Sequence, residues 1–83
     1  MRLRDKMAIS RGFDHGNFVN AYETTDYSRA CEKIGKRSNN FLIGFTAGFF
    51  ASYETHEIDE CERENVEACR AFMREHTPWI AVD

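Results

Sequence analysis

The segment from Tyr53 to Cys61 holds the densest group of side chains that could take part in chemistry. His56 and Glu57 are neighbours in it, and a histidine assisted by a carboxylate can act as a general base. The helix motif of zinc proteases would need a second histidine at position 60, where this chain has Glu60. Exposed acids around the start of a helix account for the same residues. We therefore expect a protein without enzyme activity.

Three cysteines, Cys31, Cys61 and Cys69, make an odd number, so at least one thiol stays free unless it pairs between chains. Cys31 and Cys69 fall on apolar stripes, where cysteine usually serves as a small hydrophobic residue. The cysteines and the three histidines show none of the closely paired spacings of structural zinc sites. The sequence therefore predicts no catalytic cysteine, no metal and no cofactor.

Charge is distributed unevenly along the 83 residues, whose net charge is −3. Residues 1–37 hold eight Lys or Arg and five Asp or Glu, whereas residues 38–83 hold three and nine. The acidic part contains a cluster that we call the acidic surface, which comprises Glu54, Glu57, Asp59, Glu60, Glu62, Glu64 and Glu67. The basic part contains a cluster that we call the basic surface, which comprises Arg29, Lys33, Lys36 and Arg37.

The two surfaces predict different partners. The acidic surface would attract a protein with a basic groove, because it imitates the charge of nucleic acid. The basic surface, with the cations of residues 1–11, would contact nucleic acid itself. Both clusters are also typical of solvated faces that keep a small protein in solution.

The composition, with 42% hydrophobic and 30% charged residues, is that of one small folded domain spanning residues 1–83. Residues 1–11 show no clear period and are predicted to form a flexible basic arm. The run Gly12–Asn17 has the residue types of a turn. Asn17 would then cap a short helix with Phe18 and Tyr22 on one face.

A clearer amphipathic helix follows Thr25 and Asp26, either of which can cap it. Its apolar positions have helical spacing and are Tyr27, Ala30, Cys31 and Ile34. Gly35 and the polar residues after it are expected to end this helix.

The run Phe41–Ala51 is apolar on nearly every side, which predicts a helix buried all round. Gly44, Ala47, Gly48 and Ala51 form a smooth face that would let another backbone approach closely, and the phenylalanines at positions 41, 45 and 49 lie on a different side. The other helices could cover this run, or one side of it could close against a second copy or a host protein.

A last helix is expected to begin near Asp59, where Asp59 and Glu62 have the spacing of a capping box, and to end near Glu75. The apolar tail Trp79–Val82 should pack back onto the core. The sequence thus predicts an all-α fold, a compact bundle of about four helices with the apolar Phe41–Tyr53 helix at its centre.

The stretch Gly44–Ile58, read as GFTAGFFASYETHEI, resembles small accessory proteins of phages and mobile elements, the group that contains anti-CRISPR and other anti-defence inhibitors. Residues Phe41–Pro78 are more loosely similar to the immunity proteins that neutralise type VI secretion amidases. Both resemblances imply a small protein that works by binding another protein.

We therefore expect a cytoplasmic, non-catalytic binding module without a membrane segment. The leading hypothesis is a mobile-element inhibitor that occludes a host defence protein or nucleic-acid-handling protein through its acidic surface. The alternatives are a nucleic-acid-binding or regulatory protein that uses the basic surface, and a toxin-neutralising immunity protein. A homodimer is compatible with each of them.

Overall fold

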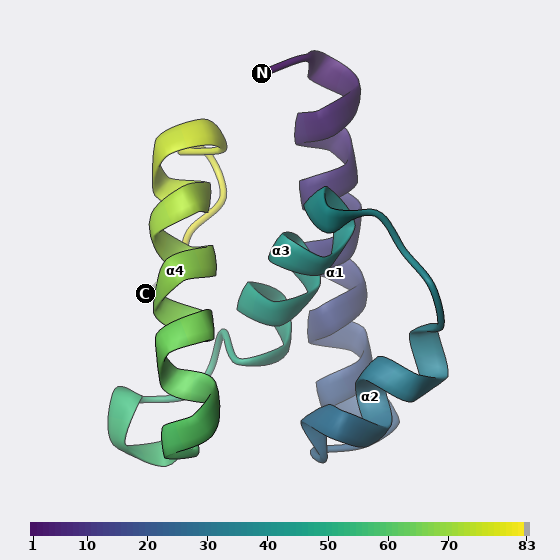
Figure 1. Ribbon diagram of the computed structural model, residues 1–83, viewed down its shortest axis with the longest axis vertical. Coiled ribbons are helices and arrows are strands. Elements are labelled where there is room, and N and C mark those ends of the chain that lie inside the picture. Colours follow the sequence, from purple (N-terminus) through teal and green to yellow (C-terminus); the bar gives the residue numbers. More distant parts are fainter. Residues whose placement is uncertain (83) are drawn as a thin grey trace.

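The computed structural model describes residues 1–82 and is built from helices joined by short links (Figure 1). The helical elements, in chain order, are α1 (Leu3–Tyr22), α2 (Tyr27–Ile34), α3 (Asn39–Phe49), the single 3-10 turn η1 (Thr55–Glu57) and α4 (Glu60–His76). The described residues contain no strand, so the predicted all-α class and the number of helices are confirmed. No helix among them has both the length and the apolar character needed to cross a membrane.

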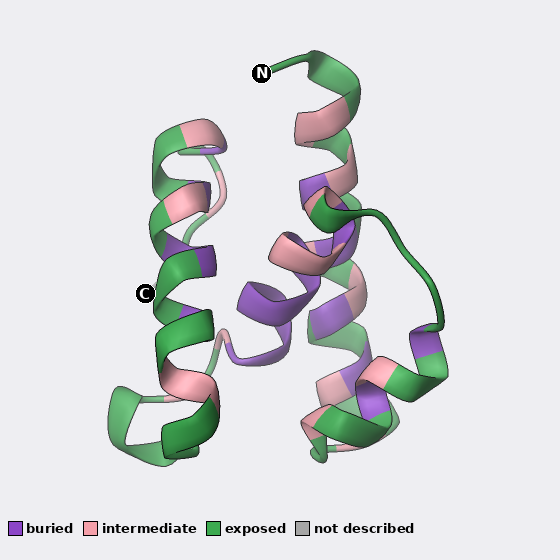
Figure 2. Cartoon of the chain, viewed as in Figure 1, coloured by how far each residue is buried: buried purple, intermediate pink, exposed green. Residues whose placement is uncertain are grey.

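Helix α3 lies at the centre, between α1 and α4, as the apolar run predicts (Figure 1). Ser38 caps its start, where the Ser38 hydroxyl accepts a hydrogen bond from the backbone N–H of Phe41 at 3.2 Å. Figure 2 shows the buried residues on α3 and on the sides of α1 and α4 that face it. The helix ends at Phe49, so Ala51 lies in the following turn rather than on the helix.

The tightest packing in the molecule joins α1 to α3 through two pairs of glycines. Gly12 and Gly16 of α1 lie against the backbone of α3 between Phe41 and Phe49, and Gly44 and Gly48 of α3 lie against the backbone of α1 at Ile9 and Phe13. A Cβ atom on any of the four would overlap backbone atoms of the opposite helix, which cannot move aside as a flexible side chain would. The close approach that the small face of α3 predicts is therefore present, and the approaching backbone is that of α1.

Residues Leu3–Tyr22 form one continuous helix, so the predicted turn at Gly12–Asn17 is wrong. The stretch predicted as an arm is helical from Leu3 onward, and the short helix predicted to begin at Asn17 is the last part of α1. Each glycine inside a helix costs about 1 kcal/mol relative to alanine, which is why the sequence suggests a break. Packing of the α1 backbone against the α3 backbone offsets that cost. Helix propensities describe only local sequence, so they cannot predict this contact.

Three phenylalanines of α3 form a row on the side next to its glycines. The ring centroids of Phe41 and Phe45 are 6.3 Å apart, and those of Phe45 and Phe49 are 6.2 Å apart. Around this row lie buried apolar residues from every other part of the chain, among them Val19, Ala30, Ile34, Ile58 and Val66. A second cluster, under α4, comprises Ile9, Ala47, Cys69, Met73 and Val82.

Helix α2 begins and ends where the sequence predicts. The Asp26 side chain caps it by accepting a hydrogen bond from the Arg29 N–H at 3.2 Å. Gly35 follows its last residue with a φ of +67°, a conformation that residues with a side chain rarely adopt.

Helix α4 follows Asp59 as predicted, but the predicted capping box of Asp59 and Glu62 does not form, because the Asp59 side chain makes no capping hydrogen bond. A capping box forms instead at η1, where the Glu57 carboxylate accepts a hydrogen bond from the Glu54 N–H at 2.7 Å. Two acids three residues apart occur twice in this stretch, as Glu54 with Glu57 and as Asp59 with Glu62, and only the first pair forms a capping box.

The apolar tail after α4 packs back only in part. Val82 is buried, whereas Trp79 is 61% exposed, with the Lys6 ammonium 5.7 Å from its ring centroid. The prediction that the whole tail covers the core is thus wrong for its largest side chain.

Replacement of Gly44 by alanine tests the backbone contact between α1 and α3. Helix propensity alone predicts that Gly44→Ala stabilises the fold by about 1 kcal/mol. We expect the opposite sign, a loss of about 3 kcal/mol or more in the free energy of unfolding, because the new methyl group overlaps the Ile9 carbonyl. Denaturant unfolding followed by circular dichroism measures it.

The control is Ala68→Gly, at an exposed position of α4, which should cost about 1 kcal/mol from propensity alone. A Gly44→Ala variant as stable as the wild type would contradict the packing described here.

Candidate functional site

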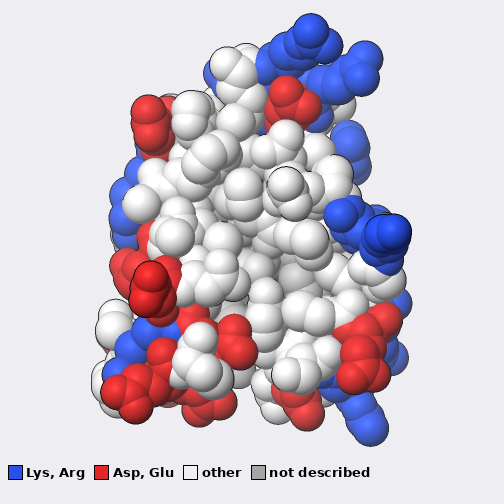
Figure 3. Space-filling model, viewed as in Figure 1, with Lys and Arg blue, Asp and Glu red and all other residues white. Residues whose placement is uncertain are grey.

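The acidic surface lies at one end of the molecule, over η1 and the start of α4, where red side chains gather at the lower left of Figure 3. Six of its seven members are exposed, and Glu62 is half-buried. The chain reversal between η1 and α4 brings together carboxylates that a single straight helix would spread along its length. The structure therefore gathers the residues that the sequence singles out into one region.

Three of the seven carboxylates take part in the capping box of η1 or in an ion pair, and Glu62 accepts a weak hydrogen bond from the Cys61 thiol at 3.8 Å. Glu54 and Glu57 form the capping box of η1. Glu67 accepts a hydrogen bond from Arg70 Nη1 at 3.1 Å. The other four carboxylates, which form no ion pair among residues 1–82, are Asp59, Glu60, Glu62 and Glu64.

The nearest cation along the chain, Arg63, forms no ion pair with this group within residues 1–82. Its Nε donates a hydrogen bond to the Thr55 backbone carbonyl at 3.1 Å, so the guanidinium ties α4 to η1. Backbone carbonyls bind an arginine without cancelling its charge, but they hold it at the η1 side of the helix. The four carboxylates are therefore left free to meet a charge from outside.

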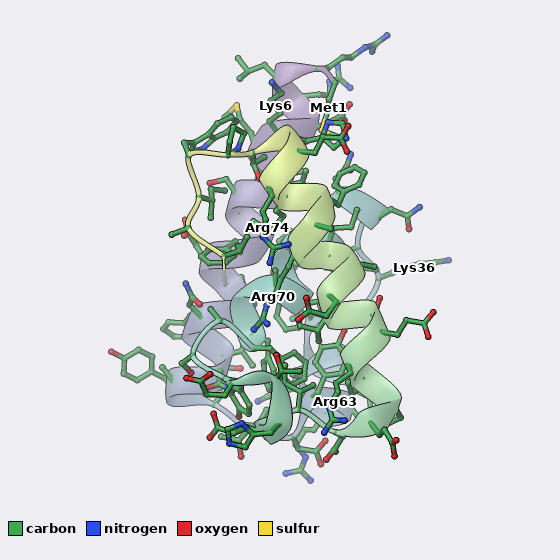
Figure 4. The ribbon with its side chains drawn as sticks, turned by 90° about the vertical axis from the view of Figure 1, so that its left-hand side faces the viewer. Met1, Lys6, Lys36, Arg63, Arg70 and Arg74 are labelled. Atoms are coloured by element: carbon green, nitrogen blue, oxygen red, sulfur yellow. The ribbon has the colours of Figure 1, made fainter. Side chains whose placement is uncertain are left out.

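Arg70 is a buried residue that the sequence analysis did not single out. It is only 2% exposed, and its Nη2 donates hydrogen bonds to the carbonyl oxygens of Phe50 at 3.0 Å and Tyr53 at 3.3 Å. In Figure 4, Arg70 lies between α4 and the segment that follows α3. Both carbonyls lie beyond the end of α3, where the helix supplies no donor; the Phe50 carbonyl also accepts from the Tyr53 N–H at 3.0 Å, and Arg70 adds a donor to each of them.

A signal for this role exists in the sequence. Val66, Cys69, Arg70 and Met73 fall at positions i, i+3, i+4 and i+7, and all four are buried. An arginine on the apolar stripe of a helix indicates a buried charge with a specific partner. Its Nε is the one buried side-chain nitrogen or oxygen without a hydrogen-bond partner in residues 1–82.

An uncharged groove of about 550 Å³ runs between α2, α3 and α4, in the central white region of Figure 3. Its lining includes Tyr27, Cys31, Leu42, Thr46 and Cys69. The Tyr27 and Thr46 hydroxyls are 2.7 Å apart and hydrogen-bond to each other. Burial raises the pKa of the Tyr27 hydroxyl, and it also raises the pKa of the Cys69 thiol.

Both groups are therefore held in their neutral forms, which makes them structural rather than reactive. A nucleophilic cysteine needs a lowered pKa, and Cys69 has the reverse. Cys61, the exposed cysteine, lies in a separate depression beside Glu62.

The basic surface is less continuous than the sequence suggests. The Lys33 ammonium lies 3.6 Å from the Glu23 carboxylate, which offsets its charge. Arg37 donates from Nε to the Ile34 carbonyl at 3.0 Å, and its guanidinium lies 4.5 Å from the centre of the Phe41 ring. Arg29 and Lys36 are exposed, and Lys36 points away from the molecule in Figure 4.

The residues first considered for catalysis do not converge. His56 is exposed on η1. Within residues 1–82, no three His, Cys, Asp or Glu side chains come together in a way that could hold a metal ion.

Replacement of Arg70 by methionine tests its role as the clamp on the end of α3. Arg70→Met keeps most of the apolar stem but removes the donor to the half-buried Tyr53 carbonyl and one of the two donors to the buried Phe50 carbonyl, which keeps the Tyr53 N–H at 3.0 Å. It also leaves Glu67 without its ion-pair partner, so we expect a loss of about 1–3 kcal/mol in the free energy of unfolding. Arg74→Met is the matched control, because Arg74 lies one turn later on the same helix and is exposed, and it should change stability by less than about 0.5 kcal/mol. Equal losses of stability in the two variants would contradict the proposed role of Arg70 at the end of α3.

The order of cysteine alkylation tests the environments of the thiols. With iodoacetamide at about pH 8, Cys61 should react first and Cys69 last, because Cys61 is exposed whereas burial raises the pKa of Cys69. Peptide mass spectrometry of timed samples gives the order. Denatured protein, in which all three thiols should react at similar rates, is the control, and fast labelling of Cys69 in the folded protein would contradict the structure.

Comparison with known proteins finds no family model, no curated protein and no solved structure that matches the chain.

Proposed function

We propose that this chain is a non-catalytic protein-binding module whose acidic surface occupies the basic, nucleic-acid-binding groove of another protein. The observation that carries the proposal is the group of four unpaired carboxylates, Asp59, Glu60, Glu62 and Glu64, on one end of a small rigid fold. Their neighbour Arg63 is held by a backbone carbonyl.

The geometry resembles a short stretch of nucleic acid backbone in one respect, namely that it holds several negative charges at fixed positions. Glu60 and Glu64 are four residues apart on α4, so they lie on the same side of the helix. Because α4 and Arg70 fix the backbone positions of these residues, only their side chains must be ordered on binding, and this favours affinity. A groove built for phosphates would supply the lysines and arginines that they lack.

The resemblance of Gly44–Ile58 to phage and mobile-element accessory proteins suggests the biological setting. In that setting, the partner is a cytoplasmic host defence protein of the CRISPR type or another nucleic-acid-handling protein, and binding blocks access of nucleic acid to it. The chain then acts by stoichiometric occlusion and performs no reaction of its own.

Charge reversal on α4 tests the proposal. The tagged protein is used to capture partners from nuclease-treated bacterial lysate at low and high salt, with mass spectrometry of the retained proteins. We expect one protein to be retained in a stoichiometric complex and to be lost at high salt, because unpaired surface charges are screened. The variant Glu60→Lys with Glu64→Lys should abolish its capture. Glu67 is left intact because it pairs with Arg70.

A control variant, Glu32→Lys with Glu75→Lys, makes the same change in net charge at two exposed positions outside the acidic surface, and it should capture the partner normally. Circular dichroism verifies that both variants are folded. Equal capture by the two variants would exclude the acidic surface as the contact, and self-association alone, seen by size-exclusion chromatography, would exclude the proposed partner class.

A further inference from the structure

A second surface, on α1 and the α2–α3 link, combines exposed aromatic rings with arginines. Phe18 is 49% exposed and Tyr22 is 79% exposed, although both are large apolar or aromatic residues on a well-packed helix. Their ring centroids are 5.2 Å apart, and the His15 ring stacks on Phe18 at 6.3 Å with an angle of 19° between the planes. Three rings thus follow one another along α1.

The ring series continues into the core at its inner end. The His15 ring lies 6.0 Å from each of the Phe41 and Phe45 rings of α3. The buried phenylalanines therefore hold the imidazole in place, and the imidazole supports Phe18. Rings that are fixed before binding offer a flat surface at little entropic cost.

Two arginines from distant parts of the chain meet at this ring series. Arg11 of α1 and Arg37 of the α2–α3 link both line an open groove of about 390 Å³ together with His15, Phe18 and Phe41. Neither arginine has an ion-pair partner among residues 1–82. The Nε of Arg37 donates to the Ile34 carbonyl, and its Cζ lies 4.5 Å from the centre of the Phe41 ring, so the guanidinium is positioned. Its terminal nitrogens form no hydrogen bond within residues 1–82.

One acid, Asp14, also lines the groove, so the two arginines leave the groove with a net positive charge. Further cations border this side of the molecule, where blue side chains follow the right-hand edge of Figure 3 over α1 and the α2–α3 link. The ligand that matches the surface must therefore carry both anionic groups and flat rings that are free to stack. Unstacked bases on a phosphate backbone have this chemistry, and aromatic rings interleaved with basic side chains are how proteins bind single strands.

We infer that the surface formed by Arg11, His15, Phe18 and Arg37, with Tyr22 at its end, binds single-stranded nucleic acid. The rings take successive bases, and the two guanidiniums contact phosphates. A duplex does not satisfy the same surface, because its bases are already stacked on one another. This inference is independent of the acidic surface, which lies over η1 and the start of α4.

Fluorescence anisotropy with a labelled oligonucleotide of about 12 nucleotides, a length within the usual site sizes for single strands, tests the inference. Single-stranded DNA and single-stranded RNA of one sequence are compared with the DNA duplex, using the purified full chain. We expect saturable binding of a single strand and weaker binding of the duplex. Two phosphate contacts predict about a sevenfold loss of affinity between about 50 and 200 mM salt.

Four variants locate the contact. Phe18→Ala should weaken binding about fivefold or more, because it removes one stacking ring. Arg11→Gln should weaken binding and flatten its salt dependence, and Asp14→Asn should tighten binding about twofold or more, since it removes the one acid in the groove. Trp79→Ala is the matched control, because it removes another exposed aromatic ring beside a cation, and it should leave affinity unchanged.

Arg11 and Phe18 are both exposed, and their side chains form no hydrogen bond within residues 1–82, so we expect their variants to keep the fold. Absence of saturable binding, equal affinity for single strand and duplex, or unchanged affinity of the Phe18→Ala and Arg11→Gln variants would each overturn the inference. The variant Glu60→Lys with Glu64→Lys should still bind the oligonucleotide, so a failure of the proposed protein partner is distinguished from a failure of this surface.

Discussion

The structure depends on direct contact between the backbones of α1 and α3. Four glycines make this contact possible, because no residue with a Cβ atom fits at Gly12, Gly16, Gly44 or Gly48. The approach lets a helix of eleven residues be covered by a chain of only 83, since no layer of side chains separates the two helices there. Without it, α3 would expose part of a surface that is apolar on nearly every side.

The same contact determines where the other elements lie. With the glycine side of α3 occupied by α1, its phenylalanine row lies beside that contact and packs in one cluster with Val19 of α1, Ala30 and Ile34 of α2 and Val66 of α4. Arg70 then fixes the end of α3 to α4 by donating to the carbonyls of Phe50 and Tyr53. The central helix is thus held by a backbone contact on one side, by aromatic packing on another and by a buried guanidinium at its end.

This arrangement separates the charges of the molecule in space. The acidic residues of η1 and α4 lie at one end, and the cations of α1 and the α2–α3 link lie along another edge (Figure 3). Between the two is an uncharged groove over α3, in which burial keeps the Tyr27 hydroxyl and the Cys69 thiol neutral. The two oppositely charged surfaces are thus held apart on one core, as both proposals require.

The sequence by itself determined the class of the fold, the amphipathic helix α2 with its Asp26 cap, the central position of α3 and the membership of the acidic surface. These features follow from short-range patterns: helical spacing, a capping side chain, an uninterrupted apolar run and a local excess of acids. Only the tertiary structure decided that Gly12 and Gly16 continue a helix, that Glu54 and Glu57 form the capping box, and that Arg70 is buried. Each of these depends on a partner distant in sequence or on competition between equivalent local signals. Only the tertiary structure also shows that Arg11 and Arg37 line one groove. The packing of α1 on α3 brings these residues together, and nothing in the sequence between them indicates that they are close.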